Sequence, residues 1–309
     1  MSALDGVRDR AVDMSFAAGW RLVRAMPESA AHGLFRSAAD VGLRRDGRGA
    51  RQLRRNLRRV VGPLMPEAQL TDLVRAGLRS YARYWQEAFR LPSLDKNDVV
   101  ARFDLAGVDV MDKSIAAGQG VVLVLPHMSN WDVAGLWLIE HGVRFTTVVE
   151  RLKPDSLFRR FVAYREAIGM EILPLTGGAR PTSTVLAERL AAGGCICLVG
   201  DRDLSSRGVD VEFFGEVARM PAGPATLAAR TGAALHPVGL WNDGPDWAGQ
   251  VGEAITLPEG SLAASARAGT QHIADEFAVS IAEHPADWHM LQRLWVSDLT
   301  VGTDEAGSR

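Results

Sequence analysis

Short apolar runs alternate with amphipathic segments from about Leu105 onward, and this alternation restricts the fold more than any other feature. Each run is too short to cross a membrane and has a length typical of a buried strand. The predicted strands cover residues 120–125, 145–149, 171–175, 195–199, 209–214, 234–241 and 249–255. The predicted helices cover residues 130–141, 154–169, 181–192, 223–231 and 262–284. Such alternation is typical of an α/β fold, with a largely parallel central sheet flanked by helices on both faces.

The first part of the chain has a different pattern. Residues 5–92 carry helical periodicity, and prolines and glycines between residues 27 and 66 separate four predicted helices. We therefore expect a helical, membrane-facing region over residues 1–92, an α/β core over 93–301 and a disordered tail over 302–309, all within one compact unit.

One segment of the helical region is strongly basic. Between Arg44 and Arg59 there are eight arginines and one acid, Asp46. Such a segment suits an anionic membrane surface, where each arginine adds roughly 1 kcal/mol of attraction. The alternative is a solvated basic helix. Nucleic acid is not expected as a partner, because the segment lacks aromatic residues for base stacking.

The chain shows no sign of export or of a membrane span. It has no run of 18 apolar residues, and its N-terminus lacks the apolar core and cleavage site of a signal peptide. Cys195 and Cys197 alternate within one predicted strand, so a disulfide or a metal site there is not expected. We expect the protein on the cytosolic side, free or attached to a surface.

A histidine follows one of the buried strands. Pro126 ends the apolar run of residues 121–125, because proline cannot extend a ladder, and His127 comes next at the strand's carboxyl end. Open α/β sheets bind their ligands at that edge. A neutral imidazole can accept the proton of an attacking alcohol, and Asp132, in an H-x4-D spacing, can orient the ring. The alternative is that Asp132 belongs to a capping box that begins at Ser129.

Charged residues follow two other predicted strands. Glu150 follows the strand at 145–149, and Arg165 lies on the next helix. This pair can bind the hydroxyl groups of a sugar or inositol headgroup, or it can form a mutual salt bridge. Asp201 and Arg202 follow the strand at 195–199, where the carboxylate can reach His127 and the guanidinium can bind a phosphate. The alternative for Asp201 is a role in a turn or a cap.

Three further motifs carry a resemblance to a known family. They are DRDL at residues 201–204, FFGEVARMPAGPATLAARTGA at 213–233 and HPADWHMLQ at 284–292. Together with the H-x4-D spacing, they resemble the late acyltransferases of bacterial lipid A biosynthesis, within the glycerophosphate and lysophospholipid acyltransferase superfamily. The resemblance covers residues 20–295. VVERLKP at 148–154 and YRE at 164–166 make the chain most similar to those members that act on phosphatidylinositol mannosides.

The resemblance implies a peripheral enzyme on the cytoplasmic face of the plasma membrane. It would transfer a long acyl chain, typically palmitoyl, from acyl-CoA to the 6-hydroxyl of a mannose in phosphatidylinositol mono- or dimannoside. No metal and no cofactor beyond the acyl-CoA co-substrate is expected. The alternatives are a lipid A acyltransferase that depends on acyl carrier protein, and a non-catalytic lipid-binding protein of the same fold.

The resemblance also assigns roles to residues. It makes His127 the general base, Asp132 its motif carboxylate and Asp201 the supporting acid, and it places Glu150 and Arg165 on the mannose. The family has Glu where this chain has Asp201, one methylene shorter, so contact with His127 is either direct or through water. From the chemistry we expect direct transfer without an acyl-enzyme, oxyanion donors among the backbone N–H groups of 129–131, and an apolar groove for the acyl chain.

Overall fold

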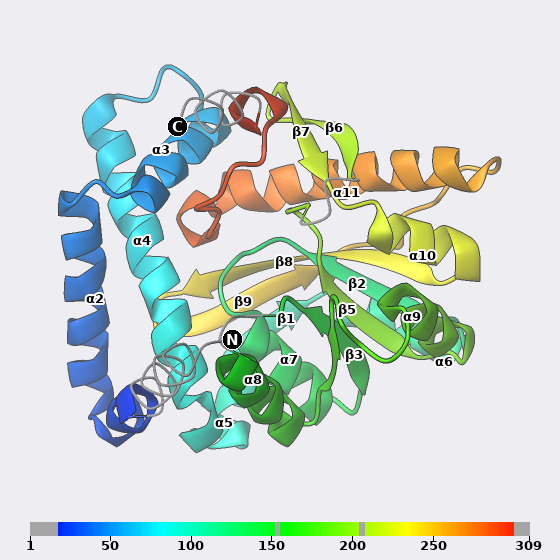
Figure 1. Cartoon of the computed structure of the whole chain (residues 1–309), viewed down its shortest axis with the longest axis horizontal. Helices are drawn as coiled ribbons and strands as arrows, with labels where there is room; N and C mark the ends of the chain where they lie inside the picture. The colour runs from blue at the N-terminus through cyan, green and yellow to red at the C-terminus, as the bar shows by residue number, and fades with distance from the viewer. Residues whose placement is uncertain (1–17, 152–154, 204–207, 300–309) are drawn as a thin grey trace, which may run out of the picture.

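The computed structural model describes residues 18–151, 155–203 and 208–299, and a mainly parallel sheet forms its centre. The strand order is β1-β9-β8-β2-β5-β3-β4, and only β8 and β9 pair in antiparallel fashion. The predicted α/β class with a largely parallel sheet is confirmed (Figure 1). The strands are β1 (Phe103–Ala106), β2 (Val121–Leu125), β3 (Phe145–Val149), β4 (Glu171–Pro174), β5 (Cys195–Val199), β8 (Ala234–Asp243) and β9 (Asp246–Val251).

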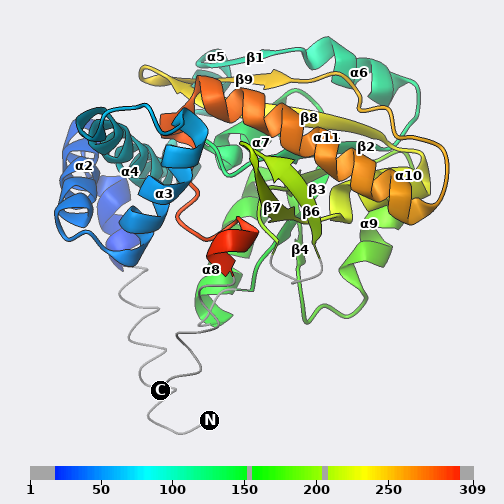
Figure 2. The same ribbon diagram turned by 90° about the horizontal axis from the view of Figure 1, so that it is seen from above.

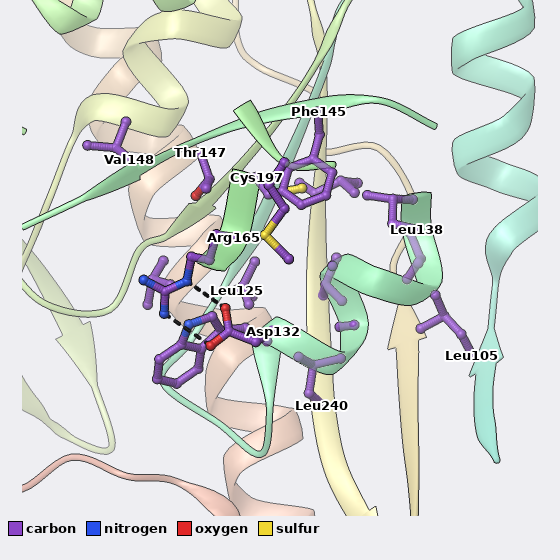
Figure 3. Close-up of a pocket in the computed structure, with 18 of the residues that line it drawn as sticks. Leu105, Leu125, Asp132, Leu138, Phe145, Thr147, Val148, Arg165, Cys197 and Leu240 are labelled. Atoms are coloured by element: carbon purple, nitrogen blue, oxygen red, sulfur yellow. Dashed lines mark hydrogen bonds and ion pairs between the residues drawn. The ribbon is translucent and has the colours of Figure 1, made fainter. Parts of the chain in front are cut away.

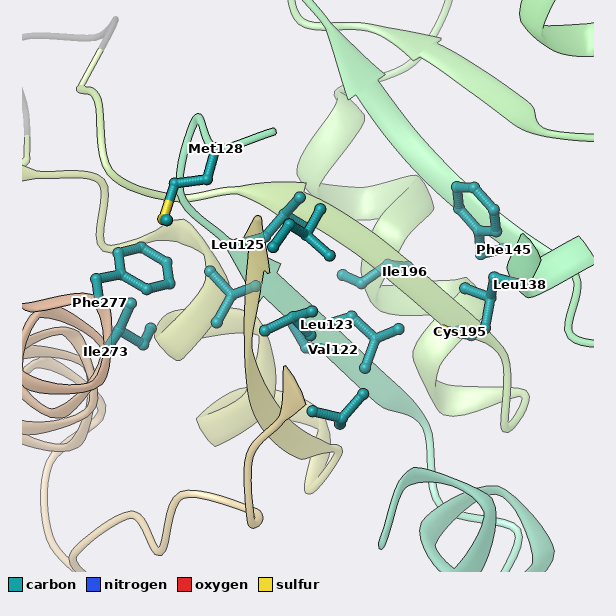
Figure 4. Packing of buried hydrophobic residues seen from close by; sticks show 14 of the residues in the cluster. Val122, Leu123, Leu125, Met128, Leu138, Phe145, Cys195, Ile196, Ile273 and Phe277 are labelled. Atoms are coloured by element: carbon teal, nitrogen blue, oxygen red, sulfur yellow. The ribbon is translucent and has the colours of Figure 1, made fainter. Parts of the chain in front are cut away.

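Both faces of the sheet are covered. Successive side chains of its central strand, β2, point to opposite faces, so each face needs its own apolar partners. Leu123 and Leu125 of β2 point toward a cavity beneath α7 (Trp131–Glu140). Helix α11 (Leu262–Glu283) covers the other face (Figure 2), and its Phe277 and Ile273 pack near β2 (Figure 4). The remaining helices of the α/β part are α5 (Lys96–Ala101), α6 (Val108–Ala116), α8 (Asp155–Ile168), α9 (Thr182–Ala191), α10 (Gly223–Thr231) and the 3-10 turns η1 (Leu91–Ser93) and η2 (Pro285–Asp287).

One predicted strand does not belong to the central sheet. Strand β6 (Val209–Phe213) pairs with β7 (Glu216–Met220) in a separate antiparallel hairpin. The hairpin is attached through Trp295, whose indole nitrogen donates to the carbonyl of Phe213 at 3.0 Å. The prediction that residues 209–214 lie in the main sheet is therefore wrong, because a tight turn at Phe214 and Gly215, both with positive φ, returns the chain along itself.

The N-terminal helices α2 (Glu28–Arg44), α3 (Arg48–Val61) and α4 (Glu67–Arg90) pack beside the sheet. Leu53, Leu57 and Val74 form a small core among them. The helical segment at residues 18–25 joins the main core through Trp20, whose indole nitrogen donates to the carbonyl of Phe89 at 2.8 Å. Helix α4 also contacts η2, so it links the helical region to the α/β part. The predicted tail at 302–309 lies outside the described residues.

The basic segment around α3 has both structural and free arginines. Arg59 is only 14% exposed in its side chain, binds Asp298 at 2.9 Å and lies over the ring of Trp295. Arg54 and Arg58 both pair with Glu67. The exposed arginines of this segment whose side chains make no ion pair or hydrogen bond with the described residues are Arg44, Arg45, Arg48 and Arg55. None of the described helices has the length and apolar character that a membrane span requires.

Candidate active site

His127 and Asp201 meet at the carboxyl edge of the sheet. Strands β2 and β5 pair in parallel with Leu125 opposite Val199, so the residues that follow them emerge side by side. The Nδ1 atom of His127 lies 2.5 Å from Oδ1 of Asp201, and the backbone N–H of His127 donates to Oδ2 at 2.9 Å. Asp201 therefore contacts the imidazole directly, without a bridging water, and this resolves the alternative that its shorter side chain left open.

The carboxylate of Asp201 is fully buried and fully hydrogen-bonded. The indole nitrogen of Trp288 donates to its Oδ2 at 3.0 Å. Burial alone would raise the pKa of Asp201, but the charge of the neighbouring His127 and the hydrogen bonds from His127 and Trp288 hold that pKa below its ordinary value. Asp201 is thus a fixed anion that orients the ring and stabilises an imidazolium.

The edge of the His127 ring that carries Nε2 is accessible. Its side chain is 27% exposed, and Nε2 makes no hydrogen bond with any residue that the structure describes. When Nδ1–H donates to Asp201, Nε2 carries the lone pair. Nε2 can therefore accept a proton from a ligand, while the carboxylate of Asp201 sets the tautomer of the ring from the opposite side.

Asp132 occupies a different place from the one expected. Its two carboxylate oxygens accept from Nε and Nη2 of Arg165 at 2.7 and 3.0 Å, and the side chain of Asp132 is only 1% exposed (Figure 3). The expectation that Asp132 orients the His127 ring is wrong for this structure, because Asp201 holds that position. The predicted capping box is also wrong, since Asn130 caps α7 by accepting from the N–H groups of Asp132 and Val133.

The predicted pair of Glu150 and Arg165 is not formed either. Arg165 is committed to Asp132, and the charge of Asp132 raises the pKa of the guanidinium although burial would lower it. Glu150 instead pairs with Arg202 at 3.5 Å, at the ends of β3 and β5. Glu150 is 53% exposed and Arg202 26% exposed, so both remain accessible to a ligand at this edge. Asp203 accepts from the N–H of Gly208 at 2.8 Å.

The backbone after His127 is held by a segment that the site assignment missed. Residues 127–129 run antiparallel to residues 287–289, with Met128 bridged to Trp288. The N–H of His289 donates to the carbonyl of His127 at 2.7 Å, and the N–H of Ser129 donates to the carbonyl of Asp287 at 3.0 Å. The motif HPADWHMLQ signalled this segment, but nothing in the sequence indicated which strand end it would contact.

A buried polar network lies directly behind this segment. Ser80 of α4 donates to Asp287 at 2.6 Å and contacts Nε2 of His289 at 2.9 Å. Asn242 of β8 donates its backbone N–H to Asp287 at 3.0 Å and accepts from the hydroxyl of Ser129 at 3.1 Å. Burial, with a smaller effect from His127, lowers the pKa of His289 to about 3, so this imidazole is neutral at physiological pH. His284 stacks on Trp241 at a ring distance of 4.4 Å.

An apolar cavity begins beside the Asp132–Arg165 pair and runs between the sheet and α7. It encloses about 790 Å³ of non-atom space, including open solvent. Its walls are mainly aliphatic and aromatic, with few polar groups apart from the ion pair, Thr147 and Cys197 (Figure 3). The lining residues include Leu105, Leu123, Leu125, Leu138, Phe145, Met170 and Leu240. A narrow apolar cavity of this kind fits a hydrocarbon chain better than a polar metabolite.

Comparisons with known proteins agree with the motifs. Residues 8–297 match the family model described as bacterial lipid A biosynthesis acyltransferase. The chain is 53% identical over 289 residues to a phosphatidylinositol mannoside acyltransferase of Mycolicibacterium smegmatis, covering 93% of this chain and 92% of that protein. It is 50% identical over 295 residues to the protein of the same name from Mycobacterium tuberculosis (strain H37Rv), covering 94% and 90%.

Proposed function

We propose that this chain, which belongs to the family of bacterial lipid A biosynthesis acyltransferases, transfers a long acyl chain to a phosphatidylinositol mannoside. The expected donor is palmitoyl-CoA and the expected acceptor is the 6-hydroxyl of a mannose. The observation that carries this proposal is the contact between His127 and Asp201 at an accessible sheet edge beside an apolar cavity. The names of the relatives support the acceptor class.

The proposed chemistry uses His127 as the general base. Nε2 accepts the proton of the mannose hydroxyl while the oxygen attacks the thioester carbonyl, and Asp201 stabilises the imidazolium. The tetrahedral intermediate then collapses with cleavage of the C–S bond, and the imidazolium returns its proton to the departing thiolate of CoA. No residue is acylated. General-base assistance of this kind contributes roughly a hundred- to ten-thousandfold in rate.

The backbone N–H groups of Asn130 and Trp131 are available to stabilise the oxyanion, whereas that of Ser129 is not. Ser129 has a positive φ of 46° and donates its N–H to Asp287, so it is already engaged. The N–H groups of Asn130 and Trp131 make no hydrogen bond among the described residues, and they lie at the start of α7. We assign the oxyanion to these two groups, since unpaired N–H groups at a helix start favour negative charge.

The acyl chain is proposed to occupy the apolar cavity. Each methylene removed from water contributes about 0.8 kcal/mol, so a long chain gains most of its binding energy there. Glu150 and Arg202 lie at the same edge as His127 and are proposed to contact the polar headgroup of the acceptor. Arg165 is placed at the cavity wall by its pair with Asp132, and its proposed role is to support that wall.

Membrane attachment is proposed to be peripheral, on the cytoplasmic face of the plasma membrane. The support is the set of exposed, unpaired arginines Arg44, Arg45, Arg48 and Arg55, since anionic lipid attracts such clusters. Replacement of Arg44, Arg45 and Arg48 by Glu should weaken binding to phosphatidylglycerol-containing vesicles. The same binding by this variant and the wild type at low salt would refute the attachment.

The decisive experiment is an acyl-transfer assay. The protein is incubated with labelled palmitoyl-CoA and phosphatidylinositol mannosides, and the acylated product is measured. His127→Ala should abolish transfer, whereas His272→Ala, on an exposed part of α11, should leave it unchanged. Full transfer by His127→Ala would remove the base from the mechanism. A preference for acyl carrier protein over CoA, or binding of acyl-CoA without transfer by the wild type, would favour the other two functions.

A further inference from the structure

A second, basic groove lies between helices α2 and α4, and we call it the α2–α4 groove. It encloses about 770 Å³, including open solvent. Cationic or titratable side chains line it from both helices, and no carboxylate is among its lining residues. The residues that matter here are His32, Arg36, Arg79, Ser80, Arg83 and Gln86. Neither His127 nor the residues of the apolar cavity line it, so it is separate from the proposed active site.

The positive charges of this groove are only partly compensated. Arg83 binds Glu87 and the carbonyls of the β8–β9 turn, so its donors are committed. Arg79 binds both oxygens of Asp40 through Nε and Nη2, at 2.8 and 2.7 Å, which leaves its Nη1 without a hydrogen bond among the described residues. The side chain of Arg36 makes no ion pair or hydrogen bond with the described residues. The groove therefore retains about one uncompensated positive charge, with guanidinium donors facing a common space.

The groove also contains a buried acceptor without a donor. Gln86 is 3% exposed, and its side-chain oxygen accepts no hydrogen bond from any residue that the structure describes. A buried polar group left unpaired costs about 1–3 kcal/mol, so such a group usually has a ligand or a water as its partner. An amide oxygen requires a donor, and a phosphate dianion cannot supply one. A hydroxyl group can.

We propose that the α2–α4 groove binds a phosphorylated polyol. Its phosphate accepts hydrogen bonds from the free guanidinium donors of Arg36 and Arg79, and one of its hydroxyl groups donates to the oxygen of Gln86. Arg is suited to this role because its planar donors match phosphate oxygens. Ser80 connects the floor of the groove to His289, and the N–H of His289 holds the carbonyl of His127, so an occupied groove lies one layer behind the proposed base.

The test is calorimetric titration of the full chain with myo-inositol 1-phosphate and, separately, with inorganic phosphate. The wild type should bind the inositol phosphate more tightly. Arg36→Gln should lower the affinity for both ligands by about tenfold. Gln86→Leu should weaken only the inositol phosphate, because inorganic phosphate does not need the amide. Arg267→Gln is the control, since Arg267 is an exposed residue of α11 outside the groove and should leave both affinities unchanged.

A second arm distinguishes the source of the ligand. Competition by vesicles containing phosphatidylinositol, but not by phosphatidylcholine vesicles, would support a lipid headgroup, and binding of the soluble ester alone would support a free polyol phosphate. The inference is overturned if the wild type binds neither ligand at millimolar concentration, or if Arg267→Gln weakens binding as much as Arg36→Gln. No acyl donor or mannoside is present, so the result is independent of the proposed transfer reaction.

Discussion

Arg165 holds both carboxylate oxygens of Asp132, at 2.7 and 3.0 Å, and the side chains are only 12% and 1% exposed. The pair joins α8 to the first turn of α7, directly beside the apolar cavity. The pair gives the carboxylate five residues after His127 a structural role, although this carboxylate does not touch the imidazole. Asp132 fixes the helix from which Asn130 and Trp131 present their N–H groups.

Removal of Arg165 should therefore destabilise the fold strongly. Arg165→Met leaves the Asp132 carboxylate buried without a cation, which costs about 3–5 kcal/mol of unfolding free energy. The double variant Asp132→Asn with Arg165→Met should recover part of that loss. Urea unfolding measures both. Arg159→Met, at an exposed ion pair on the same helix, is the control and should lose less than about 1 kcal/mol. A loss of that small size in Arg165→Met would show that the pair is not desolvated.

Asp201→Asn should lower the transfer rate while leaving the fold intact. The amide carries no negative charge, so it does not stabilise the imidazolium of His127. It also does not hold the proton of the neutral ring on Nδ1. We expect the turnover number to fall by about a hundred- to ten-thousandfold. Asp243→Asn, at an exposed position at the end of β8, should behave as the wild type. A turnover number within threefold of the wild type in Asp201→Asn would contradict the proposed orientation of His127.

Trp288→Phe tests whether the indole positions the carboxylate of Asp201. The variant keeps a ring of similar shape but loses one hydrogen bond to a charged group, an interaction of about 1.5–3 kcal/mol. We expect the turnover number to fall at least tenfold with little change in KM, since the substrate does not touch this buried residue. Trp295→Phe loses only its bond to the Phe213 carbonyl and serves as the matched control. Equal effects in the two variants would indicate a packing role alone.

The strands that the sequence predicted best lie beside one another in the sheet, from its centre to the edge formed by β4. β2, β3 and β5 are short β-branched or aliphatic runs, and their expected and observed bounds differ by one residue at most. β1 and β7 were missed because Phe103–Ala106 and Glu216–Met220 contain charged or small residues that give no continuous apolar run. Their pairing depends on partners elsewhere in the chain, which local periodicity does not contain.

The candidate site was also predicted only in part, because its contacts depend on elements that lie far apart in the sequence. The position of His127 at a strand end followed from Pro126, and Asp201 followed from the end of a second strand. Their contact depends on the neighbouring placement of β2 and β5, which lie far apart in the sequence. The partners of Asp132 and Glu150 were assigned incorrectly. The packing of α8 against α7 pairs Asp132 with Arg165, and the neighbouring placement of β3 and β5 pairs Glu150 with Arg202.

His289 should make the stability of the protein depend on pH between 7 and 5. Its folded-state pKa is lowered to about 3, so the unfolded chain, with a histidine pKa of about 6.5, binds the proton first as the pH falls. Stability is fully present above about pH 6.5 and is lost below it, by about 2 kcal/mol between pH 7 and pH 5. The pKa of Asp201 is also lowered, but its contribution is lost only near or below about pH 4.

Urea unfolding of the wild type and His289→Gln at pH 7 and pH 5 measures this contribution. The variant should lose about 2 kcal/mol less than the wild type over that interval. His272→Gln, which replaces an exposed histidine, should lose as much as the wild type. If the stability of His289→Gln and of the wild type changes equally between pH 7 and pH 5, folded His289 takes up a proton as readily as the unfolded chain does.

Shortening the apolar cavity should change the preference for acyl chain length. Cys197 of β5 lines the cavity, and Cys197→Phe places a ring inside it. If the ring excludes about four methylenes, a long chain loses about 3 kcal/mol of burial, which corresponds to roughly a hundredfold. The ratio of kcat/KM for palmitoyl-CoA to that for octanoyl-CoA should therefore fall by at least tenfold. Val279→Phe, on the exposed face of α11, should leave the ratio unchanged. An unchanged ratio in Cys197→Phe, with folding intact by circular dichroism, would place the acyl chain outside this cavity.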